Sequence, residues 1–334
     1  MNTKVYAGRT KEKEVLQHCS SGGAFTVLSD VFLTAGNAVL CAGYNYQTHC
    51  TEFRLVFSQT ERDLCRGSMY MQSCALDTWI QAEEWLKNNP DRELMFVGVG
   101  CQGAAFIKFC ERKGLRERVT VVDIICHGVA SPMIWKQYAQ SIEKGGTLSE
   151  INFRDKRTGW NKSIGVAKLN GQEISLTKWR RVYSSRTILR PCCSSCPYTV
   201  IERQTDITIG DFWHLENSMP DFFDDMGTSV FLIHTEKGAA LFEKAKAQID
   251  YRESNTKDCW QLNLEKPTEH AENRQAFWTD YKRKGIDYVM EKYGTVTFMA
   301  KVKRKINNLM KFSGGYNLTE YPMAAYAYEE RCAA

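Results

Sequence analysis

The sequence lacks the features that mark a membrane protein or a nucleic-acid-binding protein. It has no run of about 18 apolar residues, so we expect no membrane span. Its first residues are polar and contain no apolar targeting segment, which predicts a cytoplasmic protein. The net charge of +5 is small for 334 residues and does not indicate a nucleic-acid partner. Internal repeats and low-complexity tracts are also absent.

The chain has the composition and the element order of an α/β protein. Hydrophobic residues make up 43% of it, enough to bury a large core. Between residues 20 and 145, strand-like segments alternate with helix-like segments, which predicts a mainly parallel sheet flanked by helices. The predicted strands are 37–46, 93–100 and 119–128, and the predicted helices are 20–36, 72–87, 104–114 and 131–146.

The chain changes character after residue 150. Short strand-like runs separated by turns predict a β-rich middle region over residues 150–235. From about residue 237 the sequence is mostly helical and rich in Lys and Glu. We therefore expect a catalytic body over residues 1–240 and a mostly helical C-terminal tail over residues 241–334.

Thirteen cysteines are the unusual feature of the composition. In a reducing compartment they are not expected to form disulfides, so the clustered ones favour metal ligation or catalysis. Cys101 and Cys126 each follow a buried strand, and the carboxyl edge of a parallel sheet is where ligands bind. Cys193 and Cys196 form a C-x-x-C pair in a proline-bounded loop. Four thiolates are the usual complement of a [4Fe–4S] cluster, so these four cysteines are the predicted ligands.

Two other interpretations of these cysteines stay open. A structural zinc site uses the same ligands, although it is typically built from two C-x-x-C pairs. Cys101 and Cys126 could instead be buried and inert, but both lie in glycine-containing turns beside polar residues. Cys192 could substitute for its neighbour Cys193, and Cys19 is a minor candidate for a reactive thiol.

A glycine motif offers an alternative function. Residues 98–103 (GVGCQG) match G-x-G-x-x-G between a strand and a helix, and Asp123 stands 20 residues further on. This pattern is typical of an NAD or FAD site in a Rossmann fold. However, Asp123 is predicted inside a strand rather than at its tip, and the motif begins nearly 100 residues into the chain.

Several stretches together resemble the coenzyme F420 hydrogenase/dehydrogenase beta subunit family. They are SSGGAF (20–25), RGSMYMQS (66–73), VGVGCQGAA (97–105), DIICHGVASPMIW (123–135), INFRDKRTGWN (151–161), RPCCSSCP (190–197), DITIGDFW (206–213) and DDMGTS (224–229). The resemblance spans about residues 15–240. It implies a protein that contains FAD with an iron–sulfur cluster nearby, held by the same four cysteines.

Three departures from the family pattern matter. No cysteine precedes Cys19, so we expect the ferredoxin-like N-terminal segment of many members to be absent. Electrons would then come from a separate partner such as ferredoxin. Gly100 stands where the family usually has Pro, which creates the apparent dinucleotide motif. Met69 replaces a usual Lys, which bears on flavin binding or substrate choice.

Candidate flavin ligands come from two further segments. A Ser/Gly turn opens the helix over 20–36, and backbone N–H groups at a helix N-terminus bind phosphate well. A plain helix cap is the alternative for this turn. The resemblance makes further polar residues candidates for flavin binding. Without the resemblance, most of these residues would be interpreted as part of an exposed turn. The flavin candidates are Ser20, Ser21, Gly22, Gly23, Arg66, Ser68, Tyr70, Ser73 and Gln102.

Two residues are candidates for a catalytic role. His127 could donate a hydrogen bond to a cluster sulfur or to the flavin, or it could be a buried, satisfied histidine. Asp211 ends an apolar strand, where an isolated carboxylate needs a partner. It could orient the flavin or transfer a proton, or it could form an ion pair with an arginine.

The sequence thus predicts an oxidoreductase with FAD and a [4Fe–4S] cluster. It would pass electrons between a partner such as ferredoxin and a small-molecule substrate. The basic middle of the chain would suit an anionic substrate or the docking of an acidic ferredoxin, and a solvated face is the alternative for these charges. One alternative is a non-catalytic electron-relay subunit of a larger redox complex. Another is a zinc-stabilised NAD(P)-dependent dehydrogenase.

Overall fold

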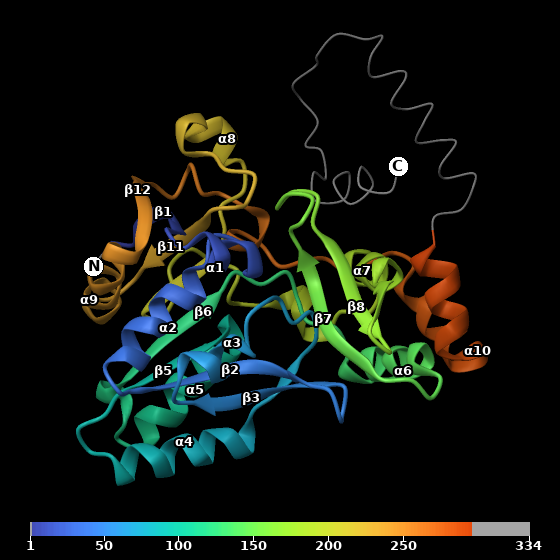
Figure 1. Ribbon diagram of the computed structural model, residues 1–334, viewed down its shortest axis with the longest axis horizontal. Helices are drawn as coiled ribbons and strands as arrows, with labels where there is room; N and C mark the ends of the chain where they lie inside the picture. The colour runs from blue at the N-terminus through green and yellow to red at the C-terminus, as the bar shows by residue number, and fades with distance from the viewer. Residues whose placement is uncertain (1, 296–334) are drawn as a thin grey trace.

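The computed structural model describes residues 2–295, which form an α/β protein built around one large sheet (Figure 1). The strand order in this sheet is β12-β1-β11-β10-β6-β5-β2-β3-β4. The four central strands, β10, β6, β5 and β2, run parallel, whereas β1, β11, β12 and β3 join antiparallel. The strands are β1 (Lys4–Thr10), β2 (Ala38–Asn45), β3 (Cys50–Val56), β4 (Ser73–Cys74), β5 (Leu94–Val99), β6 (Val119–Ile124), β10 (Ile207–Asp211), β11 (Ser229–Ile233) and β12 (Ile249–Ser254).

Helices cover both faces of the large sheet. On one face, α2 (Ala24–Thr34) and α9 (Glu236–Ala245) bury apolar residues against Met95 and Val122. On the other face, α4 (Leu76–Asn88) and α5 (Gly100–Arg112) pack on Phe96 and Val121. Neighbouring strand residues therefore point to opposite helix layers, as the alternation of side chains along a strand requires. The predicted parallel sheet flanked by helices is confirmed.

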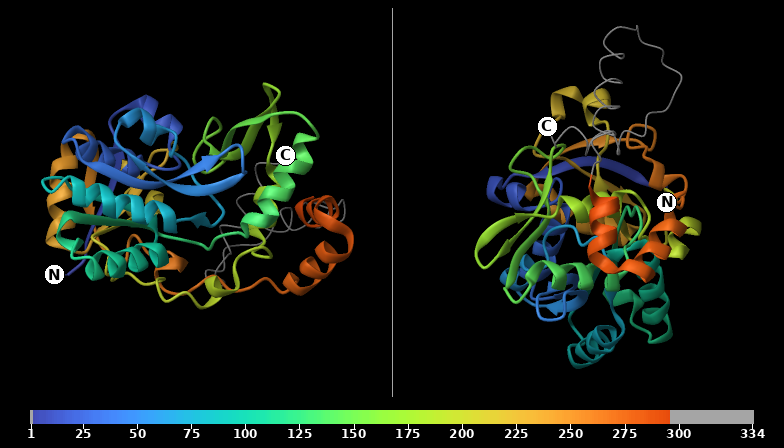
Figure 2. Two further views of the ribbon diagram at one scale, coloured as in Figure 1. Left: turned by 90° about the horizontal axis from the view of Figure 1, so that it is seen from below. Right: turned by 90° about the vertical axis from the view of Figure 1, so that its right-hand side faces the viewer.

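The β-rich middle region is divided between two sheets, because β10 and β11 join the large sheet while the strands before them form a second, smaller unit. Its three-stranded antiparallel sheet consists of β7 (Leu148–Asp155), β8 (Ile164–Leu169) and β9 (Gln172–Ser175). This sheet shares a core with α6 (Pro132–Glu143), α7 (Thr177–Ser184) and α10 (Arg274–Gly294). Trp135 and Trp179, both fully buried, lie at its centre with ring centroids 4.8 Å apart. Figure 2 shows α6 and α10 at the end of the molecule opposite the N-terminus.

Short elements complete the described chain and correct some predicted boundaries. The helix predicted over 72–87 begins only at Leu76, because Ser73 and Cys74 pair with β3 as β4. The helix predicted from Ala104 begins at Gly100, which places Cys101 in its first turn. The remaining short helices are α1 (Lys13–His18), α3 (Gln59–Asp63) and α8 (Leu215–Ser218).

The C-terminal part is mostly helical in the described residues, as α9 and α10 show, but it also adds a strand to the sheet. β12 lies beyond the predicted boundary at residue 240 and pairs with β1 over six residue pairs. The sheet therefore extends past that boundary, and the division at 240 stays a prediction. Residues 296–334 of the predicted tail lie outside the described residues. None of the helices within residues 2–295 is both long and apolar enough to cross a membrane.

Candidate functional site

The candidate site lies where the central parallel strands end. Val99, the last residue of β5, is opposite Ile124, the last residue of β6. Cys101 follows β5 in the first turn of α5, and Cys126 follows β6 by two residues. The predicted placement of two cysteines at the carboxyl edge of neighbouring strands is thus what the structure has. This edge is the usual ligand-binding position of open α/β sheets.

Backbone pairing brings the C-x-x-C loop to the same edge. Ala130 forms isolated β-bridges with both Met71 and Leu189. The Arg190 N–H then donates to the Val129 carbonyl at 3.0 Å, immediately before the short 3-10 helix over Pro191–Ser195. Gly128 has a φ of +130°, and a Cβ there would stand 3.4 Å from Cβ of Cys193. The loop therefore packs directly on the segment that carries Cys126.

The four predicted ligands, hereafter the thiol set (Cys101, Cys126, Cys193 and Cys196), lie within electrostatic reach of one another. Burial, followed by the nearby Cys196 and Cys193, raises the pKa of Cys101 to about 11. Burial raises the pKa of Cys126 to about 12, with further contributions from the other three thiols, although the Gly128 N–H donates to its sulfur at 3.3 Å. Three separate segments of the chain thus place their thiols in one neighbourhood.

The donor atoms of the thiol set are those of a structural zinc site and of an iron–sulfur cluster alike. Within residues 2–295, no three His, Cys, Asp or Glu side chains converge closely enough to hold one metal ion. A structural zinc site needs such convergence, with sulfur atoms about 2.3 Å from the ion. In a [4Fe–4S] cluster each thiolate binds a different iron, so the four sulfurs stand farther apart. The thiol set supplies the four thiols that such a cluster requires.

A second surface lies on the α2 side of the same edge. Because side chains alternate along strands, Ile124 and Asp211 share the face of Val122 and Ile209, which pack towards α2. Ile124 is 37% exposed although it ends a central strand. The loop before α2 contributes Ser20, whose hydroxyl accepts a 2.8 Å hydrogen bond from Ser68. We call Ser20, Ser68, Ile124 and Asp211 the α2-side surface.

The rest of the Ser/Gly turn is used inside the protein. The Ser21 hydroxyl donates to the Thr228 carbonyl, and the Gly22 N–H donates to the Ser229 hydroxyl, both at 3.0 Å. A Cβ at Gly22 would stand 2.4 Å from the Gly8 carbonyl oxygen, so glycine is required by close packing on the sheet. Gly23 has a φ of +86° and is the N-cap residue of α2. In this turn, glycine therefore permits close packing against the protein's own backbone rather than contact with a ligand.

Most other flavin candidates also have internal partners. Arg66 forms an ion pair with Asp63 at 2.7 Å, although its Nε is buried without a hydrogen-bond partner. Gln102 Nε2 donates to the Ser73 carbonyl at 3.2 Å, which ties the start of α5 to β4. Tyr70 is stacked on Tyr183 with ring centroids 4.5 Å apart, and burial raises the pKa of its hydroxyl.

Asp211 has the arginine partner that the ion-pair interpretation requires. Arg154 Nη1 lies 2.6 Å from its Oδ2, and the Trp160 indole N–H donates to its Oδ1 at 3.2 Å. The Arg154 and Asp211 side chains are only 12% and 14% exposed. Next to this pair, Lys156 is buried and donates to the Ser21 carbonyl at 2.8 Å. Asp211 is therefore held in one orientation by two side-chain partners.

His127 resembles a satisfied histidine more than a charged donor. Its Nδ1 lies 3.3 Å from the Thr268 hydroxyl, and its ring is 5.8 Å from that of Tyr183. Burial, followed by the charge of Arg186, lowers the pKa of His127 to about 4. The imidazole is therefore neutral near pH 7, beside Cys126.

The glycine motif at 98–103 serves packing. A Cβ at Gly98 would stand 2.8 Å from the Phe96 ring, and one at Gly100 would stand 2.9 Å from Asp123 Oδ2. Asp123 itself is fully buried and forms an ion pair with Arg203 at 2.6 Å. It is thus not available to bind a ribose, which removes the basis of the dinucleotide interpretation.

Sequence reasoning missed several residues around Asp211. In the sequence, Arg154 and Lys156 only contribute to the basic middle of the chain, and no local pattern marks Trp160 or Ile124 as functional. The stretch INFRDKRTGWN contains three of these four residues, so its resemblance to the family was the available signal. Ile124 carries no signal of its own in the sequence, because an apolar residue at a strand end normally joins the core.

Comparisons with known proteins give a family match and a structure with a similar fold. A model of the C-terminal part of the coenzyme F420 hydrogenase/dehydrogenase beta subunit matches residues 91–258. The matched region includes the whole thiol set, His127 and Asp211. It excludes the Ser/Gly turn and the segment over 66–73. No curated protein matches the sequence.

One solved structure with a similar fold is that of the F420-reducing [NiFe] hydrogenase complex from Methanosarcina barkeri, in a study of its xenon derivatization. The similarity covers 87% of this chain and 92% of that chain, with a TM-score of 0.52 and 15% sequence identity. At this identity the comparison shows a shared fold.

Proposed function

Because the chain belongs to the coenzyme F420 hydrogenase/dehydrogenase beta subunit family, we propose that it is an iron–sulfur flavoprotein with a redox function. It would pass electrons between a protein partner, such as a ferredoxin, and a small-molecule substrate in the cytoplasm. The observation that carries the proposal is the convergence of four thiols from three segments at the carboxyl edge of the central strands. The family match covers all three segments.

The thiol set supplies the ligands for the cluster in this proposal. Cys101 is an exposed residue, and the other three cysteines are half-buried rather than part of the core. The Gly128 N–H already points at the sulfur of Cys126, and such hydrogen bonds tune a bound cluster. The neutral His127 would add no positive charge beside it.

The α2-side surface is the proposed place for FAD. Ile124 offers exposed apolar area, and Ser20 and Ser68 offer hydroxyl groups at the start of α2. Arg154 fixes the direction of Asp211, so that this carboxylate could orient the flavin or take part in proton transfer. When bound, the two cofactors would supply single-electron and paired-electron chemistry, and the protein would set their distance and access.

The direct test is anaerobic purification of the full chain followed by iron, sulfide and flavin analysis. We expect about four iron and four sulfide per chain, as the thiol set implies, together with one flavin that liquid chromatography identifies as FAD. Zinc as the only metal, with neither flavin nor sulfide, would refute the proposal and support the dehydrogenase alternative.

A relay subunit is the second candidate function. It is favoured by the fact that many predicted flavin and substrate residues are already bonded inside the protein, including Ser21, Gly22, Ser73 and Gln102. A relay would carry the same cluster and pass electrons to another subunit without a substrate. Reduction of candidate anionic substrates by the purified chain with reduced ferredoxin separates the two functions.

A further inference from the structure

The buried carboxylate of Asp123 touches all three segments that carry the thiol set. It lies on β6, three residues before Cys126. Its Oδ2 accepts from Arg203, which stands seven residues after Cys196, at 2.6 Å. The same Oδ2 borders Gly100, the residue before Cys101, where a Cβ would approach it to 2.9 Å.

The Asp123–Arg203 pair is held rigidly. Asp123 is fully buried and the Arg203 side chain is only 3% exposed. The other oxygen of Asp123 accepts hydrogen bonds from the hydroxyls of Thr205 and Thr208. Arg203 Nε also donates to the Val200 carbonyl at 3.0 Å, within the segment that leads out of the C-x-x-C loop. A buried charge pair with every oxygen satisfied fixes a single geometry.

The glycine motif finds its use here. A Cβ at Gly100 would stand 3.2 Å from Arg203 Nη1, and one at Gly103 would stand 3.2 Å from Thr205 Cγ2. Both glycines allow α5 to approach the pair, which a side chain at either position would push away. The glycine motif, which in sequence is typical of a dinucleotide site, therefore makes room for an internal ion pair.

We propose that Asp123 and Arg203 form a clamp of positioning residues that sets the spacing among Cys101, Cys126 and the Cys193–Cys196 loop. The clamp deepens the proposed function and rests on it for the identity of the cluster. Its geometric claim concerns the protein alone and can be tested without any cofactor.

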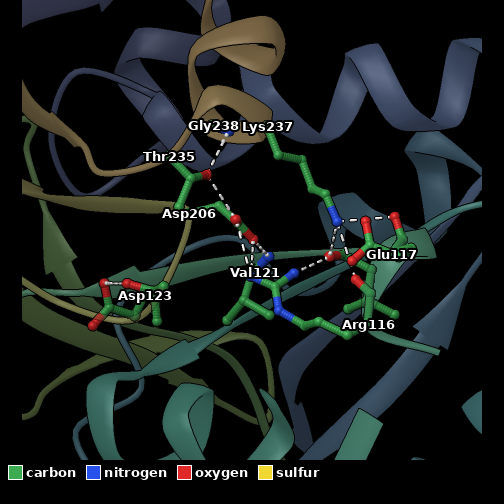
Figure 3. Close-up of polar contacts among 10 residues, drawn as sticks. Arg116, Glu117, Val121, Asp123, Asp206, Thr235, Lys237 and Gly238 are labelled. Carbon is green, nitrogen blue, oxygen red and sulfur yellow. Dashed lines mark hydrogen bonds and ion pairs between the residues drawn. The ribbon is translucent and has the colours of Figure 1, made fainter. Parts of the chain in front are cut away.

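The ion pair between Asp206 and Arg116 is a matched control for the Asp123–Arg203 pair. Asp206 is also buried and accepts from one arginine, Arg116, and from two further donors, the Val121 N–H and the Thr235 hydroxyl (Figure 3). Asp206 precedes β10 and its N–H donates to the Val121 carbonyl, so it lies towards the starts of the parallel strands. The control pair thus has similar chemistry at the edge away from the thiol set.

The first experiment uses cluster-free protein and compares Arg203→Met with Arg116→Met. Dibromobimane cross-links thiols that lie close together, and mass spectrometry maps the linked pairs. We expect cross-links between the C-x-x-C loop and Cys101 or Cys126 in the wild type and in Arg116→Met. They should fall severalfold in Arg203→Met, and equal cross-linking in the two variants would overturn the clamp. This arm stays decisive if the wild type binds no cluster, in which case only the proposed function fails.

The second experiment follows the cluster after anaerobic reconstitution. Loss of iron to a chelator should be about 10-fold faster in Arg203→Met, as for other supporting residues of metal sites. The electron paramagnetic resonance spectrum of the reduced cluster should broaden, and Arg203→Lys should restore part of both properties. Unchanged spectra and iron loss in Arg203→Met would contradict the clamp.

A double variant covers the case in which Arg203→Met does not fold. Asp123→Leu combined with Arg203→Met removes both charges, and such apolar replacements are often tolerated. We expect a folded chain by circular dichroism that still lacks the loop cross-links. Wild-type cross-linking in this variant would show that the clamp does not set the thiol spacing.

Discussion

The thiol set and the α2-side surface lie at the same edge of the sheet, but they differ in how far their residues are engaged within the protein. In the thiol set, Cys101 is an exposed residue and the other three cysteines are half-buried. Around the α2-side surface, Ser21 and Gly22 are bonded to β11 and the residue before it, and Asp211 is paired with Arg154. One region keeps unused ligands, whereas in the other most polar groups already have partners.

This difference teaches what a binding residue looks like before its ligand arrives. A buried polar group must find a partner in the folded chain, so a residue that has one is costly to recruit for a ligand. By this criterion the thiol set is the stronger part of the site. Ser20, Ser68 and the exposed Ile124 are the stronger part of the α2-side surface.

The largest expected effect comes from breaking the thiol set. Cys126→Ser should abolish stable cluster binding, because loss of a ligand exceeds the 10- to 100-fold typical of its supporting residues. Cys50→Ser, at the start of β3, removes a thiol outside the set and should retain full iron content. Iron and sulfide analysis after anaerobic reconstitution measures both. Equal iron content in the two variants would remove Cys126 from the ligands.

The two regions also differ in how well sequence could predict them. The convergence of Cys101 and Cys126 follows from local patterns, because each strand end is marked by its own apolar run. The engagement of Ser21 and Gly22 could not be predicted, since their partners Thr228 and Ser229 stand 207 residues away. The pairing of β11 with β1 in the folded sheet brings these partners next to the turn.

The glycine motif also shows that local patterns cannot reveal distant partners, because here the local pattern indicates a site that a distant residue excludes. Locally, GVGCQG with Asp123 fits a dinucleotide site. The residue that decides against this, Arg203, approaches from 80 positions away and neutralises the carboxylate inside the core. A short motif predicts a local backbone shape, while the chemistry of that shape depends on what the rest of the fold places against it.

The next effect tests how much the α2-side surface depends on its ion pair. Arg154→Gln leaves Asp211 enclosed with only the Trp160 N–H on its side chain. Breaking such a largely buried pair should lower the free energy of unfolding by about 3 kcal/mol. Arg157→Gln breaks ion pairs with Glu173 and Asp155, but the Arg157 side chain is about half exposed, so the loss should be only about 1 kcal/mol. Urea unfolding compares the two, and similar losses would mean that Arg154 is no more important than a surface charge.

A pH effect is expected at His234, which contacts a residue bonded to Asp123 near the thiol set. His234 lies 2.8 Å from Thr208, whose hydroxyl also bonds Asp123, and burial lowers the pKa of His234 to about 4. The His234 imidazole therefore binds a proton less readily in the native state than in the unfolded state. Stability is therefore fully present above the unfolded pKa of about 6.5 and is lost as pH falls towards 4.

The shifted pKa of His234 alone should lower the free energy of unfolding by about 2 kcal/mol between pH 7.5 and pH 5. His234→Gln removes the titration, so its loss of stability on acidification should be smaller than that of the wild type by this amount. Unfolding curves of both proteins at the two pH values give the difference. Parallel losses would show that His234 is already charged in the native state.

The smallest effect decides whether an engaged residue of the α2-side surface can still serve a ligand. Ser21→Ala removes the hydrogen bond to the Thr228 carbonyl, so the free energy of unfolding should fall by about 1 kcal/mol. Flavin affinity should stay unchanged, because this hydroxyl already has its partner. Ser20→Ala is the matched change one residue earlier and should weaken flavin binding, since the Ser20 hydroxyl is bonded to the equally adaptable hydroxyl of Ser68 rather than to the backbone. Titration with FAD, monitored by flavin fluorescence, measures both variants. If Ser21→Ala weakened flavin binding more than Ser20→Ala, internal engagement would be the wrong criterion for separating the two regions.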